Sequence, residues 1–213
     1  AKHLSETRNF DGTVYFCFQP AEEGGAGAQA MIEDGLFEKY PARAVYGMHN
    51  APGTPVGTFA AVPGPVMASA DEFFIRVRGQ GGHAAQPHAA RDPVLAGAHI
   101  VTALQSIVAR KVNPLKPAVL SITMFNAGTA SNVIPDEAAI GGTVRTFHTE
   151  VYDLIKAEME RICSQIGEAM NVAVTIEREA IAYPPTVNDP TEAAFAARVL
   201  VDMVGAENVD QER

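Results

Sequence analysis

The chain has 213 residues, 47% of them hydrophobic, which is enough for a sizeable core and two modest domains. Its 16 Lys and Arg against 25 Asp and Glu give a net charge of −9 without a basic run, which argues against a nucleic-acid surface. With two cysteines, no signal peptide and no apolar segment of about 18 residues that could span a membrane, we expect a cytoplasmic protein.

The first part of the chain alternates apolar runs with a helical pattern. Residues 1–6 start without Met and are typical of the last turns of a helix, so we expect a fragment of a longer protein. Residues 13–19 predict a buried strand that includes Cys17 and ends at Pro20. A helical pattern over residues 26–40 precedes a second apolar strand over residues 43–49. This order predicts a βαβ unit with parallel strands.

Three side chains with metal-binding chemistry follow these two strands. Glu22 and Glu23 come directly after the first strand, and His49 ends the second. Because parallel strands end at one edge of a sheet, the three can converge on one ion or substrate. The alternatives stay open: the Glu pair also suits an acidic turn before a helix, and a single His at a strand end is often structural.

Turn residues then divide the chain. Pro and Gly are dense between residues 50 and 69, and Pro184, Pro185 and Pro190 form a second cluster of breakers. We therefore predict a partial catalytic domain at 1–69, an inserted domain at 70–182, and a return to the catalytic domain at 183–213, with a helix over 191–204.

The inserted segment has a complete pattern of its own. It shows alternating strands around residues 73–78, 120–124, 138–144 and 172–176, and two helices with apolar stripes, one beginning at Asp92-Pro93 and one containing Cys163. The order β-α-β-β-α-β predicts a ferredoxin-like α+β domain, with two helices on one face of a four-stranded antiparallel sheet. The stripe expected on the first helix is Val94, Leu95, Ala98, Val101, Leu104, Ile107 and Val108.

Two loops and one strand of this segment carry polar groups suited to binding. The loop of residues 79–88 holds three glycines, His83 and His88, and can either act as a flexible turn or present an imidazole to an oxyanion. Asn132 offers an amide in a second loop. Arg145 suits either a solvated strand face or a carboxylate clamp.

Five ordered motifs together are specific. Residues 19–27 (QPAEEGGAG), 47–49 (GMH), 81–88 (GGHAAQPH), 131–135 (SNVIP) and 142–145 (GTVR) resemble the M20 metallopeptidase family, in particular its amidohydrolase branch. The resemblance runs along essentially the whole chain. It implies a metal-dependent amidohydrolase that cleaves N-acyl amino acids or small peptide-like substrates.

The resemblance also implies a role for each matching residue. Glu22 matches the general base that deprotonates a metal-bound water, and Glu23 and His49 match metal ligands of a site with two divalent ions, zinc as first choice and manganese as second. His83 matches a residue that reaches the partner subunit's active site and supports the oxyanion, which implies a homodimer formed through the inserted domain. The substrate contacts would come from Asn132 and Arg145, the latter holding the substrate carboxylate.

The chain also departs from the family pattern. A Cys-Gly-His-Asp type motif and a final His are absent, Cys17 and Cys163 do not replace them, and His88 matches no role. We therefore expect weak or no metal binding and no activity from these 213 residues alone. The alternative interpretation is a non-catalytic dimerisation or ligand-binding module. We expect no nucleic-acid or membrane partner.

Overall fold

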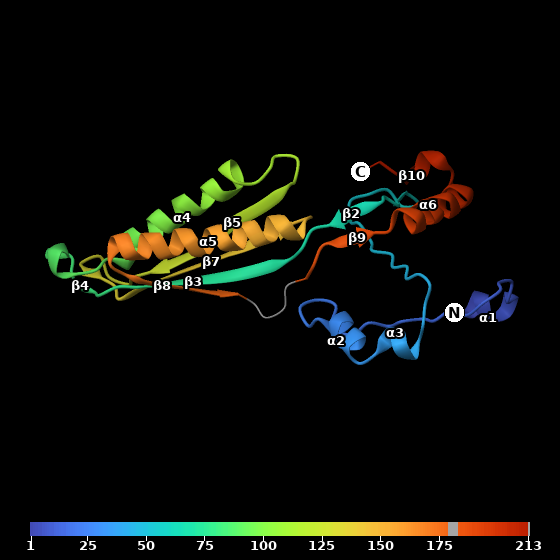
Figure 1. The fold of residues 1–213 in the computed structure, drawn as a ribbon, viewed down its shortest axis with the longest axis horizontal. Helices are drawn as coiled ribbons and strands as arrows, with labels where there is room; N and C mark the ends of the chain where they lie inside the picture. Colours follow the sequence, from blue (N-terminus) through green and yellow to red (C-terminus); the bar gives the residue numbers. More distant parts are fainter. Residues whose placement is uncertain (179–182, 213) are drawn as a thin grey trace. The chain divides into compact units, whose positions relative to one another are not determined.

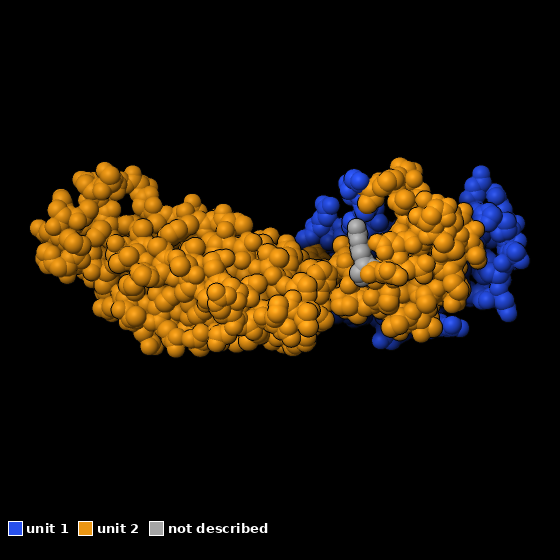
Figure 2. Space-filling model, turned by 90° about the horizontal axis from the view of Figure 1, so that it is seen from above, with its two compact units in different colours: residues 1–53 blue, residues 54–213 orange. Residues whose placement is uncertain are grey.

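The computed structural model describes residues 1–178 and 183–212. The chain forms two compact units, the N-terminal unit Ala1–Gly53 and the C-terminal unit Thr54–Arg213, coloured blue and orange in Figure 2. The predicted boundaries after residues 69 and 182 stay a prediction, and residue 182 itself lies outside the described residues.

The N-terminal unit contains short helices joined by irregular chain. They are α1 (Lys2–Thr7), α2 (Gly27–Glu33) and α3 (Leu36–Lys39). The helical pattern expected over residues 26–40 is confirmed as α2 and α3, and Gly35, with a φ of 82°, separates them. The left-handed conformation at that position suits a residue without a Cβ.

The predicted parallel strands of this unit are wrong for the described chain. Residues 13–19 and 43–49 form neither strand nor helix, and Cys17 is exposed rather than buried. The reason is the absence of partners: a strand needs a paired neighbour for its backbone groups and a covering layer for its side chains. The 53 residues of this unit provide neither, so apolar side chains such as Phe18, which is 86% exposed, stay open.

The C-terminal unit is built on a four-stranded antiparallel sheet. Its elements follow the predicted order: β3 (Asp71–Arg78), α4 (Pro93–Arg110), β5 (Ala118–Ala127), β7 (Glu137–Thr146), α5 (Thr149–Met170) and β8 (Ala173–Arg178). The strands lie in the order β5-β7-β3-β8, and every neighbouring pair is antiparallel. We call residues 71–178 the four-stranded domain (Figure 1).

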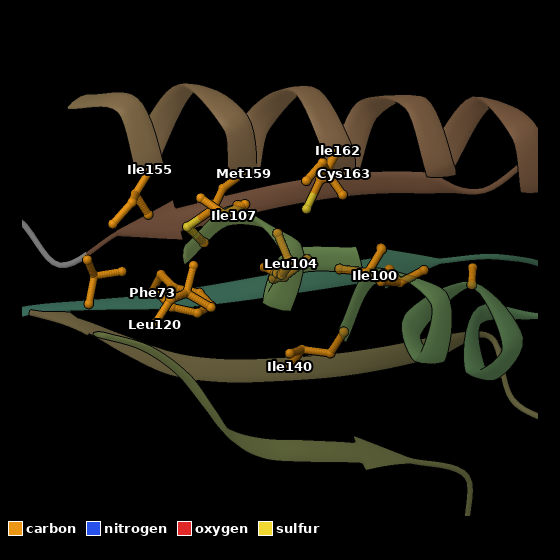
Figure 3. Packing of buried hydrophobic residues seen from close by; sticks show 14 of the residues in the cluster. Phe73, Ile100, Leu104, Ile107, Leu120, Ile140, Ile155, Met159, Ile162 and Cys163 are labelled. Carbon is orange, nitrogen blue, oxygen red and sulfur yellow. The ribbon is translucent and has the colours of Figure 1, made fainter. Parts of the chain in front are cut away.

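One face of this sheet forms the hydrophobic core. Along β3, Phe73, Ile75 and Val77 point inward while the residues between them are exposed, as the alternation predicts. Helices α4 and α5 pack over this face, and Figure 3 shows their buried side chains beside those of the strands, such as Phe73 and Ile140. Cys163 lies in this core, which confirms its prediction.

The buried face of α4 differs from the predicted stripe at its start. Val94 and Leu95 are exposed, whereas Ala96 and Gly97 are buried. A Cβ on Gly97 would meet the Phe125 ring at 3.0 Å, so small residues let the first turns approach the sheet closely. Helix α4 also passes the length and composition test for a membrane span, contrary to our expectation of no such segment, but part of it packs in the core.

Shorter elements flank the four-stranded domain in the same unit. Strand β1 (Phe59–Ala60) pairs parallel with β10 (Val209–Asp210), and β2 (Gly64–Met67) pairs antiparallel with β9 (Thr186–Asn188). The expected helix over 191–204 is confirmed as α6 (Pro190–Val204), which the short helix η2 (Ala206–Asn208) follows. The chain enters and leaves the domain side by side, since the Ala70 and Tyr183 backbones exchange hydrogen bonds of 2.9 and 3.0 Å.

Candidate functional site

The turn that carries Glu22 and Glu23 precedes α2 directly. Ala21 and Gly24 adopt positive φ angles of 47° and 86°, which reverse the chain after Pro20. The turn closes tightly, because a Cβ on Gly27 would overlap the Pro20 carbonyl oxygen. Both carboxylates are exposed at adjacent positions, so they are accessible to an ion or a substrate.

The ring of His49 has one nitrogen engaged. Its Nδ1 lies 2.7 Å from the Asn50 carbonyl oxygen, which can only accept a hydrogen bond. In the neutral ring Nδ1 therefore carries the proton, and the lone pair of Nε2 remains available. An imidazole held in this way has the form in which His binds a metal ion.

The metal-binding side chains do not form a complete site. Among residues 1–178 and 183–212, no group of three His, Cys, Asp or Glu side chains gathers in a way that could hold an ion. Glu23 and His49 have the donor chemistry that a zinc-like ion accepts, but such an ion takes four ligands or more. The ligand atoms of Glu23 and His49 are therefore of the type that such an ion binds, and they supply part of its coordination.

In the C-terminal unit, the structure brings His83 and Asn132 together. The short strand β4 (Gly82–His83) pairs antiparallel with β6 (Val133–Ile134), and the Ala84 amide donates to the Asn132 carbonyl at 3.0 Å. The Ala85 amide donates to His83 Nδ1 at 3.1 Å. This bond makes Nδ1 the acceptor, so Nε2 carries the proton of the neutral ring and can donate to a substrate oxygen.

The glycines of this loop allow its close turns. A Cβ on Gly79 would overlap the Arg91 carbonyl oxygen, and one on Gly81 would lie 2.6 Å from the Ile134 carbonyl oxygen. The Gly81 amide donates to Asp136 Oδ1 at 2.8 Å, which ties the loop to the start of β7. His88 lies in the short helix η1 (Pro87–Ala89), and we assign it no role.

Arg145 lies near the end of β7 and is half-buried. Its Nη1 donates to the Val144 carbonyl at 3.0 Å, to the Asp71 carbonyl at 3.5 Å, and to the Thr143 hydroxyl. All three acceptors are neutral. Among the described residues Arg145 forms no salt bridge, whereas Arg76 and Arg78 of the same sheet pair with Glu137. No carboxylate of residues 1–178 or 183–212 therefore pairs with its positive charge.

Arg145 and the His83 loop lie at opposite ends of the four-stranded sheet. The loop is tied to Asp136, just before β7 begins, while Arg145 is eight residues along that strand from Glu137. At about 3.4 Å per residue, this separation is about 27 Å. Figure 1 shows β4 at the end of the sheet remote from β2 and β9. One small substrate cannot contact both within the same domain.

A buried polar cluster beside Arg145 was missed by sequence reasoning. Asp71 is 2% exposed, and its Oδ2 accepts hydrogen bonds from Arg178 Nη1 and from the Tyr152 hydroxyl, both at 3.2 Å. Burial, and then the charge of Asp71, raise the pKa of Tyr152. The sequence signal was available, because Asp71 continues the inward alternation of Phe73 and Ile75, where an apolar residue is expected.

Comparison with known proteins places this chain in a family. A model of peptidase family M20/M25/M40 matches residues 1–213. The chain is 42% identical over 210 residues to a hippurate hydrolase of Campylobacter jejuni, covering 99% of this chain and 54% of that protein. It is 41% identical over 202 residues to an N-acetylcysteine deacetylase of Bacillus subtilis, covering 95% of this chain and 52% of that one. The chain thus spans about half the length of these relatives.

A solved structure agrees. The chain matches a dinuclear metal-binding peptidase of the M20 family from Bacillus subtilis, with a TM-score of 0.67 and 32% identity, over 92% of this chain and 48% of that one. The α/β fold of the chain is similar to that of this peptidase.

Proposed function

The chain belongs to peptidase family M20/M25/M40, and from this premise we propose that it serves, in the full-length protein, as part of a metal-dependent amidohydrolase. The proposed substrates are N-acyl amino acids or small peptide-like amides. The relatives support this class, since the substrates in their names, hippurate and N-acetylcysteine, are acylated amino acids with a free carboxylate.

The observation that carries the substrate class is the unpaired charge of Arg145. A guanidinium held by neutral oxygens, with no acidic partner among the described residues, is suited to bind the carboxylate that an N-acyl amino acid retains. We propose that Arg145 fixes this end of the substrate and thereby orients the amide bond.

The reaction would take place at the turn of Glu22 and at His49. We propose that Glu23 and the free Nε2 of His49 hold a divalent ion, zinc before manganese, together with further ligands, and that the full site contains two ions. When bound, such an ion supplies an activated water and polarises the amide carbonyl. Glu22, exposed beside Glu23, would accept the proton of the attacking water and pass it to the leaving nitrogen.

His83 would act on the amide oxygen. With its Nδ1 accepting from the Ala85 amide, the Nε2–H group can donate to the negative charge that develops on that oxygen. Asn132, adjacent to His83 through the pairing of β4 with β6, would add a polar contact to the substrate.

The separation within the sheet supports a homodimer. About 27 Å along β7 is longer than a small N-acyl amino acid, so a substrate held by Arg145 of one protomer would meet His83 from the partner. We propose that the four-stranded domain mediates this dimer. Its strand order, with β3 and β7 in the centre, also supports the ferredoxin-like assignment.

For the 213 residues by themselves, a second function, that of a self-associating module, is supported by the structure's exposed apolar residues. Since no three metal-binding side chains gather among the described residues, we propose that this chain alone binds metal weakly and is inactive. The exposed Leu95 on α4 and Met124 on the edge strand β5 favour a self-associating module. We also propose a cytoplasmic location, which the free thiols of Cys17 and Cys163 support.

The proposed chemistry is tested in the full-length protein loaded with Zn²⁺ or Mn²⁺. We expect Glu22→Gln to lower kcat for hippurate and N-acetylcysteine by roughly 100- to 10,000-fold, because the general base is lost. Glu33→Gln, an exposed glutamate of α2, serves as the matched control and should retain full activity. Equal rates for Glu22→Gln and the wild type would refute the role of Glu22.

The shared site is tested by mixing two inactive variants. In a heterodimer of His83→Ala and Arg145→Ala protomers, one site keeps both residues, so exchange of subunits should restore about a quarter of the wild-type activity. If both residues act within one protomer, the mixture will stay inactive.

A further inference from the structure

The first residue of β3 is an unusual choice for its position. Asp71 occupies the inward phase of the strand, in line with Phe73 and Ile75, and is 2% exposed. A carboxylate loses hydration there and is tolerated only with partners. Its partners are Arg178, the last residue of β8, and Tyr152 near the start of α5, each at 3.2 Å from Oδ2.

Stability alone is a weak reason for this ion pair. Replacing a buried ion pair with apolar residues of similar volume is often neutral or stabilising. Asp71 Oδ1 and Arg178 Nη2 are also buried without a hydrogen-bond partner among the described residues, which adds a cost. The pair does, however, hold the start of β3 in one place between β8 and α5.

The backbone of Asp71 connects this cluster to the other face of the sheet. Its carbonyl oxygen accepts from the Thr143 hydroxyl at 2.9 Å and from Arg145 Nη1 at 3.5 Å. The Thr143 hydroxyl in turn contacts Arg145. Residue 71 thus has its side chain locked on the core side, while its carbonyl holds the hydroxyl and the guanidinium on the open side.

The comparison with Arg76 shows why this link matters. Arg76 on the open face is held by the carboxylates of Glu137 and Glu177. Arg145 has no such charged partner among the described residues, so its direction depends on backbone carbonyls and on Thr143. A shift of the Asp71 carbonyl would therefore reach the guanidinium mainly through the Thr143 hydroxyl, which donates to that carbonyl at 2.9 Å and contacts Arg145.

We infer that Asp71, locked by Arg178 and Tyr152, is a positioning residue that aims Arg145 at the substrate carboxylate. This inference rests on the proposed function, in which Arg145 binds that carboxylate. Asp71 acts through Arg145 and does not itself touch the substrate.

The test compares two substrates of similar size, one with a carboxylate and the other with a neutral carboxamide at the same end. Release of benzoate from hippurate and from its neutral amide, hippuramide, is measured with the metal-loaded, full-length protein. In the wild type the ratio of kcat/KM should favour hippurate. Asp71→Asn should lower this ratio about 10-fold, mostly through KM for hippurate, and change the hippuramide rate less than about twofold.

Coupling to Arg145 separates positioning from general damage. Arg145→Ala should abolish the preference for hippurate. The double variant with Arg145→Ala and Asp71→Asn should show no further decrease in the ratio of kcat/KM for hippurate to that for hippuramide. Because Asp71→Asn leaves Arg178 buried without a counter-charge and can impair folding, Asp71→Leu with Arg178→Met provides a folded variant without the ion pair. It should show the same loss of preference. Met159→Ala, which removes a buried side chain of α5, is the control for destabilisation and should keep the ratio.

Each outcome is decisive. If Arg145→Ala lowers the ratio while Asp71→Asn and the Leu–Met pair retain it, the inference is overturned and the proposed function stands. If Arg145→Ala leaves the ratio unchanged, the role of Arg145 fails and the inference fails with it.

Discussion

The N-terminal unit and the four-stranded domain have similar apolar runs and opposite outcomes. Phe18 ends a run of residues that suits a strand and is 86% exposed, whereas Phe73 begins such a run and is fully buried. The difference is the presence of a covering layer: β3 pairs with β7 and β8 under two helices, while residues 13–19 have no paired strand. An apolar pattern therefore identifies side chains that favour burial. Whether they are buried depends on the strands and helices that the rest of the chain packs against them.

Side-chain truncation should give the largest contrast between the two regions. Leu104→Ala removes a fully buried side chain of α4 and should lower the free energy of unfolding by about 2–5 kcal/mol. Phe18→Ala removes a larger side chain that makes few contacts, so it should change the free energy of unfolding by less than about 0.5 kcal/mol. Urea denaturation followed by circular dichroism measures both. A large loss for Phe18→Ala would mean that the N-terminal unit packs more tightly in solution.

The two cysteines should report the same contrast chemically. Burial raises the pKa of Cys163 to about 12, while Cys17 is exposed. At pH 8 a disulfide reagent should modify Cys17 at least about 100-fold faster than Cys163, because the thiolate is the reactive form. Cys17→Ser is the control and should abolish the fast phase. Two equally fast thiols would contradict the buried position of Cys163.

The same pKa shift predicts a pH dependence of stability. Well below pH 9 the Cys163 thiol is protonated in both the folded and the unfolded state, so its contribution to the free energy of unfolding is constant. As the pH rises from 9 toward about 12, the unfolded state loses this proton first, and the free energy of unfolding should fall. Cys163→Ala should remove this part of the decline in pH-dependent urea titrations.

Helix capping should give a smaller contrast. Asp92 caps α4, accepting from the Val94 and Leu95 amides at 2.8 and 3.2 Å, and Asp92→Ala should cost about 1 kcal/mol. In the N-terminal unit, the side chain of Asp34 forms an exposed salt bridge with Lys39, and Asp34→Ala should leave the unfolding midpoint unchanged. Thermal melts of both variants compare the two. Equal shifts would show that the cap adds nothing beyond a surface charge.

Much of the four-stranded domain could be predicted from its sequence, because residue patterns within each strand or helix identify that element. The alternation along Phe73, Ile75 and Val77 and the Asp92-Pro93 start of α4 both determine their elements within a few residues. The burial of Ala96 and Gly97 in place of Val94 and Leu95 could not be predicted, since it depends on how closely α4 approaches Phe125. The N-terminal strands failed for the same reason: pairing depends on distant partners.

The candidate site divides in the same way. Glu22, Glu23 and His49 are identified by motif, and their roles stay predictions. The pairing that joins His83 to Asn132 links residues far apart in the sequence, which no local pattern reveals. In the sequence, Asp71 differs from its neighbours only as a charged residue at a position where the alternation of β3 places apolar side chains. Its link to Arg145 through a backbone carbonyl depends on the register in which β3 pairs with β7.

The adjacent entry and exit of the four-stranded domain have a consequence for the segments on either side of it. Ala70 and Tyr183 exchange backbone hydrogen bonds although more than a hundred residues separate them. Because these two points already lie side by side, we expect the segments on either side to lose little loop-closure entropy by carrying the domain between them. The pairing of β1 with β10 and of β2 with β9 should therefore persist when the interior of the domain is changed.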